Sequence, residues 1–118
     1  MPIGGPLSAF ESLTPELRPY AEALQALATQ YDPGSIVTST TRTFEAQQRL
    51  RDAYLRGESR FPAAAPGRSL HNYGHAFDLV TSNPELQQWL GLVWEYWGGR
   101  WGGRFNDAIH FDTGAHIG

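Results

Sequence analysis

The residues best suited to chemistry lie in two short segments in the C-terminal half of this 118-residue chain. Residues 69–78 read SLHNYGHAFD, and residues 106–111 read NDAIHF. Two imidazoles and one carboxylate form a common ligand set for catalytic zinc, which leaves a fourth position for water. A zinc ion held in this way lowers the pKa of that water to about 7. A second, unligated carboxylate beside the site could accept the proton and later deliver it to a leaving amine.

The spacing of these residues leaves other interpretations open. The chain has no His-Glu-x-x-His sequence, so it does not belong to the metalloproteases that hold zinc on such a helix. A single histidine, taken alone, is more often a hydrogen-bonded and partly buried residue than a metal ligand. A purely structural zinc is disfavoured, because such sites usually close with four protein ligands.

The composition excludes several other kinds of site and partner. The chain has no cysteine, so disulfides, thiolate metal sites and cysteine nucleophiles are excluded. Nine arginines are its only basic residues besides histidine, and the net charge is −3. They are spread along the chain, and we expect no nucleic-acid partner, because such binding needs a concentrated basic patch. No apolar run reaches membrane-spanning length, so we expect no membrane insertion.

The length is that of one domain. We expect residues 1–118 to form a single catalytic domain, with an irregular arm over residues 1–13 and a mobile tail over residues 113–118. The N-terminal sequence lacks the charged and apolar regions of a secretory signal. We therefore expect a soluble cytoplasmic protein made without a signal peptide, which needs outside help to reach a cell wall.

Apolar periodicity and turn residues predict the elements that position the two segments. Apolar residues at helical spacing predict helices capped by Thr14, Thr43 and Asn83, over residues 15–30, 43–57 and 84–97. Apolar and β-branched runs predict strands over residues 36–41, 76–80 and 108–111, with a loop over residues 58–68. Helices mixed with short strands favour an α+β domain with a small, largely antiparallel sheet. Trp89 and Trp94 are expected in the core.

Strand geometry requires two bends in the chain. Residues three apart in a regular strand point to opposite faces of the sheet. Asp107 and His110 can therefore serve one metal site only if the chain turns between them, with Asp107 outside the strand. His71 and Asp78 also need a bend between them, and Gly74 suits it because glycine accepts a positive φ.

Three stretches of the chain follow one another in an order known from one family of peptidases. They are Thr41-Arg42-Thr43 followed by Gln47 and Leu50, Ser-x-His-x-x-Gly-x-Ala-x-Asp at residues 69–78, and Trp-Gly-Gly-Arg-Phe-x-Asp-x-x-His-Phe at residues 101–111. Together they resemble the zinc D-Ala-D-Ala carboxypeptidase and L-Ala-D-Glu endopeptidase family over about residues 36–112. Thr40-Thr41 departs from the family's usual Gly-Tyr. The resemblance implies a hedgehog/DD-peptidase-like fold around a single zinc site.

The resemblance also implies roles for particular residues. It makes His71, Asp78 and His110 the ligands of one Zn²⁺ per chain. It makes Asp107 the general base, where many relatives have Glu, so the shorter side chain must approach the water more closely. It makes Arg42 the cation that polarises the scissile carbonyl and steadies the oxyanion, a task suited to a rigid and permanently charged fork.

Residues around this set receive supporting roles. Ser69 is expected at the rim of the site, where it would position substrate or a ligand. Trp101 is expected to form a wall of the cleft and contact substrate. Asp112 stands where relatives often carry Glu, and we expect it to make a hydrogen bond just outside the set of metal ligands. His75 is expected to pack or to lie at the rim, and His116 to have no role.

The function implied is a zinc metallopeptidase that hydrolyses peptidoglycan stem peptides. His-Asn-Tyr-Gly at residues 71–74 is closest to the branch of phage endolysins and bacterial L-Ala-D-Glu peptidases, so we expect cleavage of the L-Ala-D-Glu bond. D-Ala-D-Ala carboxypeptidase activity is the alternative within the family. The alternative outside it is a phage structural or binding module with weak activity. The absence of a secretory signal and of a wall-binding segment fits a phage lysis enzyme released through a holin, or a virion component assembled with other phage proteins.

Overall fold

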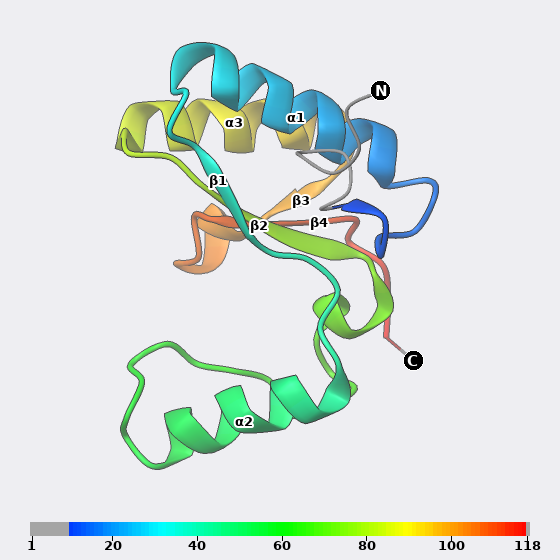
Figure 1. Ribbon diagram of the computed structural model, residues 1–118, viewed down its shortest axis with the longest axis vertical. Coiled ribbons are helices and arrows are strands. Elements are labelled where there is room, and N and C mark those ends of the chain that lie inside the picture. The colour runs from blue at the N-terminus through cyan, green and yellow to red at the C-terminus, as the bar shows by residue number, and fades with distance from the viewer. Residues whose placement is uncertain (1–9, 118) are drawn as a thin grey trace.

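A computed structural model describes residues 10–117 of the chain (Figure 1). This part of the chain forms an α+β fold, as predicted, and its helices and strands alternate along the sequence. The helices are α1 (Arg18–Tyr31), α2 (Phe44–Leu55) and α3 (Pro84–Tyr96). The strands are β1 (Ile36–Ser39), β2 (Ala76–Val80), β3 (Arg100–Trp101) and β4 (His110–Asp112). Two short 3-10 helices, η2 (Leu70–Tyr73) and η3 (Gly102–Phe105), precede β2 and β4.

The four strands form one sheet in the order β1-β2-β4-β3, with every neighbouring pair antiparallel. In the register of β2 and β4, Phe77 pairs with Phe111 and Asp78 pairs with His110. Because side chains alternate between the faces of a strand, the two phenylalanines point to one face and the polar pair to the other. Helices α1 and α3 cover the phenylalanine face, and α2 stands on the opposite side of the sheet (Figure 1).

The hydrophobic core lies between the sheet and the helices α1 and α3. Phe77 is fully buried at its centre, stacks on Phe111 at 5.5 Å between ring centroids, and meets Trp94 edge-on at 5.3 Å. Gly91 lets α3 approach the sheet closely, since a Cβ at this position would lie 2.1 Å from the Trp101 ring. This packing holds β3 and β4 against α3 and makes the sheet a rigid support for the polar side chains on its other face.

One part of the N-terminal prediction is wrong. Helix α1 begins at Arg18, not at Pro15, and Thr14 does not cap it. The reason is Pro19, which has no N–H to donate to residue 15 and whose ring would clash with that carbonyl in a regular helix. Residues 10–13 of the predicted irregular arm form no α-helix or strand, and Phe10 and Leu13 are buried in the core. The first nine residues of the arm lie outside the described residues.

The later elements agree more closely with prediction. Thr43 and Asn83 cap α2 and α3 with side-chain hydrogen bonds, and β2 spans the predicted residues. The last strand begins two residues later than expected, and β3 was not predicted because two residues are too short to show a pattern. Trp94 is in the core as predicted, but Trp89 is 41% exposed at the rim, where it packs edge-on against Tyr31.

The first residue of the predicted C-terminal tail is tied down, because the Thr113 N–H donates to the His75 carbonyl oxygen. Among the described residues, no helix is long and apolar enough to cross a membrane.

Candidate metal centre

The helical turn η2 places His71 beside the sheet. The Ser69 hydroxyl accepts a hydrogen bond from the His71 backbone N–H at 3.2 Å and so caps the turn. Gly74 ends the turn with φ +74, and a Cβ there would lie 2.9 Å from the Ser12 carbonyl oxygen. The predicted bend between His71 and Asp78 is therefore confirmed, and it depends on a glycine for both its dihedral angle and its space.

A second turn separates Asp107 from the strand that carries His110. The Asp107 N–H donates to Gly102 O at 2.9 Å, and the His110 N–H donates to Asp107 O at 3.0 Å. Asn106 adopts a left-handed conformation with φ +65 just before them. Asp107 thus lies outside β4, as predicted, and its exposed side chain stands at the rim of the site.

His71, Asp78 and His110 converge on one small volume. Each offers one ligand atom, and these three atoms lie within 4.8 Å of one another. Asp78 Oδ1 is 3.2 Å from His71 Nε2 and 3.5 Å from His110 Nδ1. In a tetrahedral zinc site with bonds near 2.0–2.1 Å, neighbouring ligand atoms are about 3.3 Å apart. The two separations from Asp78 Oδ1 therefore fit zinc.

In each histidine, the ring nitrogen farther from Asp78 lies within hydrogen-bond distance of an acceptor. His71 Nδ1 lies 2.8 Å from the Thr40 carbonyl oxygen, and His110 Nε2 lies 2.6 Å from Asp112 Oδ2. A carbonyl oxygen or an ionised carboxylate can only accept a hydrogen bond. The proton of each neutral ring therefore lies on this nitrogen, Nδ1 of His71 and Nε2 of His110. In these neutral tautomers Nε2 of His71 and Nδ1 of His110, the nitrogens nearest Asp78, carry the lone pairs that a metal would take; in a protonated ring the same nitrogen donates to Asp78. This arrangement is the one that orients histidine ligands in metal sites.

The charges in this cluster shift the protonation of its members. Burial alone would raise the pKa of Asp78, but hydrogen bonds from His110 and His71 outweigh it and lower the pKa to about 2. Burial would lower the pKa of His110, but hydrogen bonds to Asp112 and Asp78 raise it to about 9. In the metal-free protein at neutral pH, an imidazolium at position 110 therefore lies between two carboxylates.

Asp107 lies within the electrostatic reach of the same cluster. Partial burial raises the pKa of its carboxyl, the charge of His110 acts against this rise, and the charge of Asp78 adds to it. A raised pKa makes the carboxylate a stronger base than an ordinary aspartate and brings the pKa closer to neutral pH, where general acid–base catalysis is most efficient.

Arg42 points at the same site from the segment after β1. Its Nη1 donates to Gln47 Oε1 at 2.8 Å, and its Nη2 donates to Ser39 Oγ at 2.9 Å and lies 3.9 Å from Asp78 Oδ2. Burial lowers the pKa of Arg42, while the charges of Asp78 and Asp107 act in the opposite direction. A guanidinium remains protonated in proteins, so Arg42 contributes a fixed positive charge beside the candidate ligands.

Gln47 is a member of this network to which the sequence assigned no role. Its side chain is buried on α2, where its Nε2 donates to the Ala64 carbonyl oxygen at 2.7 Å. The available signal was its place in the arginine-containing stretch that resembles the family, five residues after Arg42. Thr40 and Arg100 were missed as well, because nothing in the local sequence reveals that they face His71 and Asp112.

The remaining predicted residues lie around the cluster in different ways. Asp112 is fully buried and lies 2.6 Å from His110 through its Oδ2. Ser69 is half-buried at the start of η2, and its substrate contact stays a prediction. Trp101 is only 7% exposed and its indole N–H donates to Ala108 O, so little of the ring is available to substrate. His75 lies beside Thr113, and His116 is exposed.

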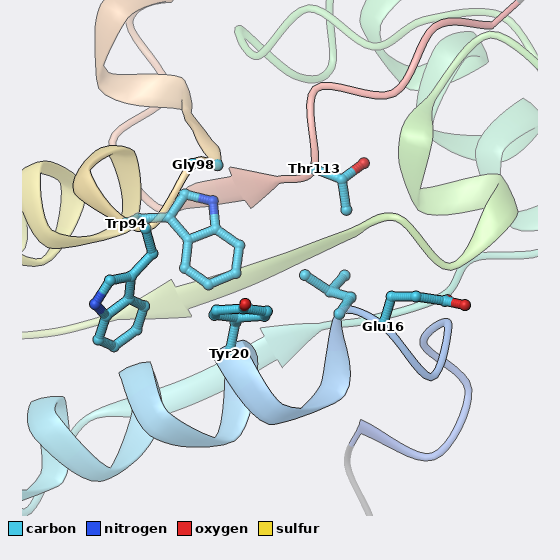
Figure 2. Close-up of a pocket in the computed structure, with 8 residues that line it drawn as sticks. Glu16, Tyr20, Trp94, Gly98 and Thr113 are labelled. Carbon is cyan, nitrogen blue, oxygen red and sulfur yellow. The ribbon is translucent and has the colours of Figure 1, made fainter.

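A separate cavity of about 180 Å³ lies on the other side of the sheet. Figure 2 shows the rings of Tyr20 and Trp94 lining it, with Glu16, Gly98 and Thr113 around its edge. None of the three candidate metal ligands lines this cavity, so it is distinct from the polar cluster described above.

Comparison with solved structures first defines the class of fold. A mutant of the vancomycin-resistance D,D-pentapeptidase VanY in complex with Zn(II), from a VanB-type resistance cassette, has a TM-score of 0.66 at 22% identity, over 86% of this chain and 73% of that one. The L-Ala-D-Glu endopeptidase ChiX of Serratia marcescens has a TM-score of 0.57 at 20% identity, over 89% of this chain and 83% of that one. The L,D-carboxypeptidase DacB of Streptococcus pneumoniae has a TM-score of 0.62 at 19% identity, over 86% and 66%. The chain thus shares the fold of these three peptidases.

The family follows from the sequence itself. The VanY family, described as D-alanyl-D-alanine carboxypeptidase, matches residues 11–101, and this chain belongs to it. No curated protein matches the chain significantly. The family match includes Arg42, His71 and Asp78 and ends before Asp107 and His110, so the placement of the last two rests on the turn after η3 and the register of β4.

Proposed function

We propose that this protein is a zinc-dependent peptidase that hydrolyses the L-Ala-D-Glu bond of peptidoglycan stem peptides. The observation that carries the proposal is the convergence of His71 Nε2, Asp78 Oδ1 and His110 Nδ1 at separations suited to zinc. These three side chains would hold one Zn²⁺ per chain. A zinc ion bound there would act as a Lewis acid toward the peptide carbonyl. It would also lower the pKa of bound water to about 7, so that hydroxide is available near neutral pH.

Asp107 acts in this proposal as the general base and acid. Its position outside β4 leaves the carboxyl exposed at the rim of the site, where it can reach both water and substrate. Its raised pKa makes it a stronger base toward water than an ordinary aspartate and brings the pKa closer to neutral pH, where general acid–base catalysis is most efficient. His110 is unsuited to this role, because Asp112 holds its Nε2 proton.

Arg42 stabilises negative charge on the carbonyl oxygen of the substrate. Gln47 and Ser39 hold the guanidinium, so it does not have to become ordered during the reaction. Ser69 positions His71 by capping η2, and its hydroxyl at the rim is proposed to contact the peptide as well.

Two findings bear on which bond is cut. The His-Asn-Tyr-Gly sequence at residues 71–74 and the similarity of fold to ChiX favour the L-Ala-D-Glu bond. The description of the family and the similarity to VanY favour D-Ala-D-Ala carboxypeptidase activity as the second candidate. On the resemblance of residues 71–74 to phage endolysins, we propose a phage lysis enzyme or a virion component as its biological setting.

The test uses the purified full chain with defined muropeptides, with zinc and with a chelator, and mass spectrometry of the products. We expect stem fragments that begin with D-Glu, and no product in the presence of chelator. Release of terminal D-Ala alone would replace the proposed bond with the second candidate. Stoichiometric zinc without any cleavage would contradict the enzymatic role.

A further inference from the structure

Asp112 connects His110 to a third residue, Arg100. The Asp112 carboxylate is fully buried, and its Oδ2 accepts hydrogen bonds from His110 Nε2 at 2.6 Å and from Arg100 Nη2 at 2.7 Å. Arg100 Nε lies 3.0 Å from both carboxylate oxygens, and the Gly114 N–H donates to Oδ1 at 2.7 Å. Of these partners, His110 contacts only Oδ2, Gly114 contacts only Oδ1, and Arg100 contacts both oxygens.

The sheet itself places these groups together. Arg100 and Asp112 are cross-strand partners in β3 and β4, on the same face of the sheet as His110. The guanidinium carbon also lies 5.1 Å from the centre of the Phe105 ring, and that ring is centred 5.9 Å from the His110 ring. Arg100 is therefore held between Asp112 and Phe105, and both of these residues contact His110.

From this arrangement we infer that Arg100 is a positioning residue for the metal site, acting on His110 through Asp112. The inference rests on the proposed zinc function. A planar guanidinium fork fixes the plane of the carboxylate that it grips, which a lysine ammonium cannot do. With the carboxylate plane fixed, Oδ2 faces His110 Nε2, and the opposite nitrogen of the ring faces Asp78. Without Arg100, the Gly114 N–H would be the remaining donor to Asp112 besides His110. The carboxylate could then rotate, and Oδ2 would no longer fix the orientation of the His110 ring.

Arg100 itself contacts none of the three candidate ligands among the described hydrogen bonds and ion pairs, so its effect must pass through Asp112. Its side chain is 54% exposed, whereas the carboxylate that it grips is completely buried. Substitution of Arg100 should therefore change the metal site more than the folding of the chain.

The test compares Arg100→Gln and Arg100→Lys with a matched control, Arg104→Gln. Arg104 is 61% exposed and pairs with Glu95, so the control removes the same charge from a similar surface position. The first readout is zinc affinity, measured by competition with a chromophoric chelator. The second is the hydrogen-exchange protection of the His110 Nε2 proton, seen by ¹H–¹⁵N NMR in the metal-free protein.

We expect Arg100→Gln to weaken zinc binding by up to about 10-fold, the lower end of the effect of removing an outer partner of a metal ligand, because Arg100 acts through Asp112. The Nε2 proton should exchange at least several-fold faster. Arg100→Lys should show a smaller loss of both, because it keeps the charge and loses the fork, and Arg104→Gln should match the wild type. Circular dichroism checks folding, and if Arg100→Gln does not fold, Arg100→Lys decides.

Wild-type zinc affinity and proton protection in both Arg100 variants would overturn the inference. So would an equal loss in Arg104→Gln, which would indicate a general effect of charge. A wild-type protein that binds zinc but cuts no stem peptide would contradict the proposed enzymatic function, while the zinc readout would still decide the role of Arg100. A wild-type protein that binds no zinc would contradict the proposed metal, and the protection of the Nε2 proton would then decide.

Discussion

Asp78 and His110 are cross-strand partners in β2 and β4, and Asp78 Oδ1 lies 3.5 Å from His110 Nδ1. Backbone pairing holds such partners about 4.5–5.5 Å apart at Cα, so the sheet itself sets the spacing of two candidate ligands. His71 is brought to the same carboxylate by η2, a separate element with its own cap and glycine. The site therefore depends on one sheet register and two turns, and each can be tested.

Zinc and a proton should compete for His110. In the metal-free protein Asp78 has a pKa of about 2 and is already ionised near neutral pH, whereas His110 has a pKa of about 9 and must lose a proton to bind zinc. Apparent zinc affinity should rise about tenfold per pH unit between about pH 7.5 and 8.5 and level off above about pH 9. Competition titrations across this range measure the slope, and a flat profile would contradict the shifted pKa of His110.

The stability of the metal-free protein should depend on pH in a related way. The folded-state pKa of His110 lies above the ordinary value of about 6.5, so its contribution is fully present below pH 6.5 and is lost as pH rises toward 9. Asp78 has a lowered pKa, so its contribution is present above about pH 4 and is lost as pH falls toward 2. Thermal unfolding in chelator should give the highest Tm between these limits. A Tm that keeps rising from pH 6.5 to 9 would contradict this account.

Asp107→Asn should separate zinc binding from turnover. The amide cannot accept a proton, so we expect a loss of about 10²–10⁴-fold in kcat with zinc content unchanged. Asp107→Glu, which restores a carboxylate, should keep much of the activity, and His110→Ala should lose both zinc and turnover. Zinc analysis and a muropeptide assay on the same preparations provide the measurement. An active Asn variant would show that another group is the base.

Gly74→Ala should destabilise the protein and displace η2. The new Cβ would combine a positive φ with a 2.9 Å approach to the Ser12 carbonyl oxygen, so we expect a loss of about 1–3 kcal/mol in the free energy of unfolding and weaker zinc binding. Gly57→Ala is the matched control, because Gly57 also has a positive φ, at +78, but nothing lies within 4 Å of its Cβ position. Gly57→Ala should lower the free energy of unfolding by about 1 kcal/mol and leave zinc affinity unchanged. Denaturant unfolding of both variants measures the difference, and equal losses would exclude the contact with Ser12 as the cause.

Gln47→Leu should impair Arg42 without removing zinc. The leucine leaves Arg42 Nη1 and the Ala64 carbonyl oxygen without their hydrogen-bond partner. Because these groups are shielded from water, the free energy of unfolding should fall by about 1–3 kcal/mol. We expect kcat to fall about tenfold, because the guanidinium loses part of its support. Gln48→Leu, which removes only an exposed bond to Asp52, is the control. Equal kcat values for the two variants would contradict the supporting role of Gln47.

Local chemistry was sufficient to predict much of this structure. Caps at Thr43 and Asn83, the apolar run of β2 and the need for a bend at Gly74 depend on residues within a few positions of one another. The two segments with histidines and acids were likewise recognisable, because recognising them requires only residue types and their spacing along the chain.

Other features were decided by contacts between distant parts of the chain. Phe10 and Leu13 look like part of a loop in the sequence, and only packing against the sheet and helices makes them core. Trp89 has helical spacing suited to the core, yet the angle of α3 leaves it at the rim. The partners of the histidines are equally remote, since Thr40 lies 31 residues before His71. The sequence by itself therefore determined which residues could bind a metal. Sheet register and two turns decided which nitrogens and oxygens face one another, because hydrogen-bond partners are chosen in space and not by spacing along the chain.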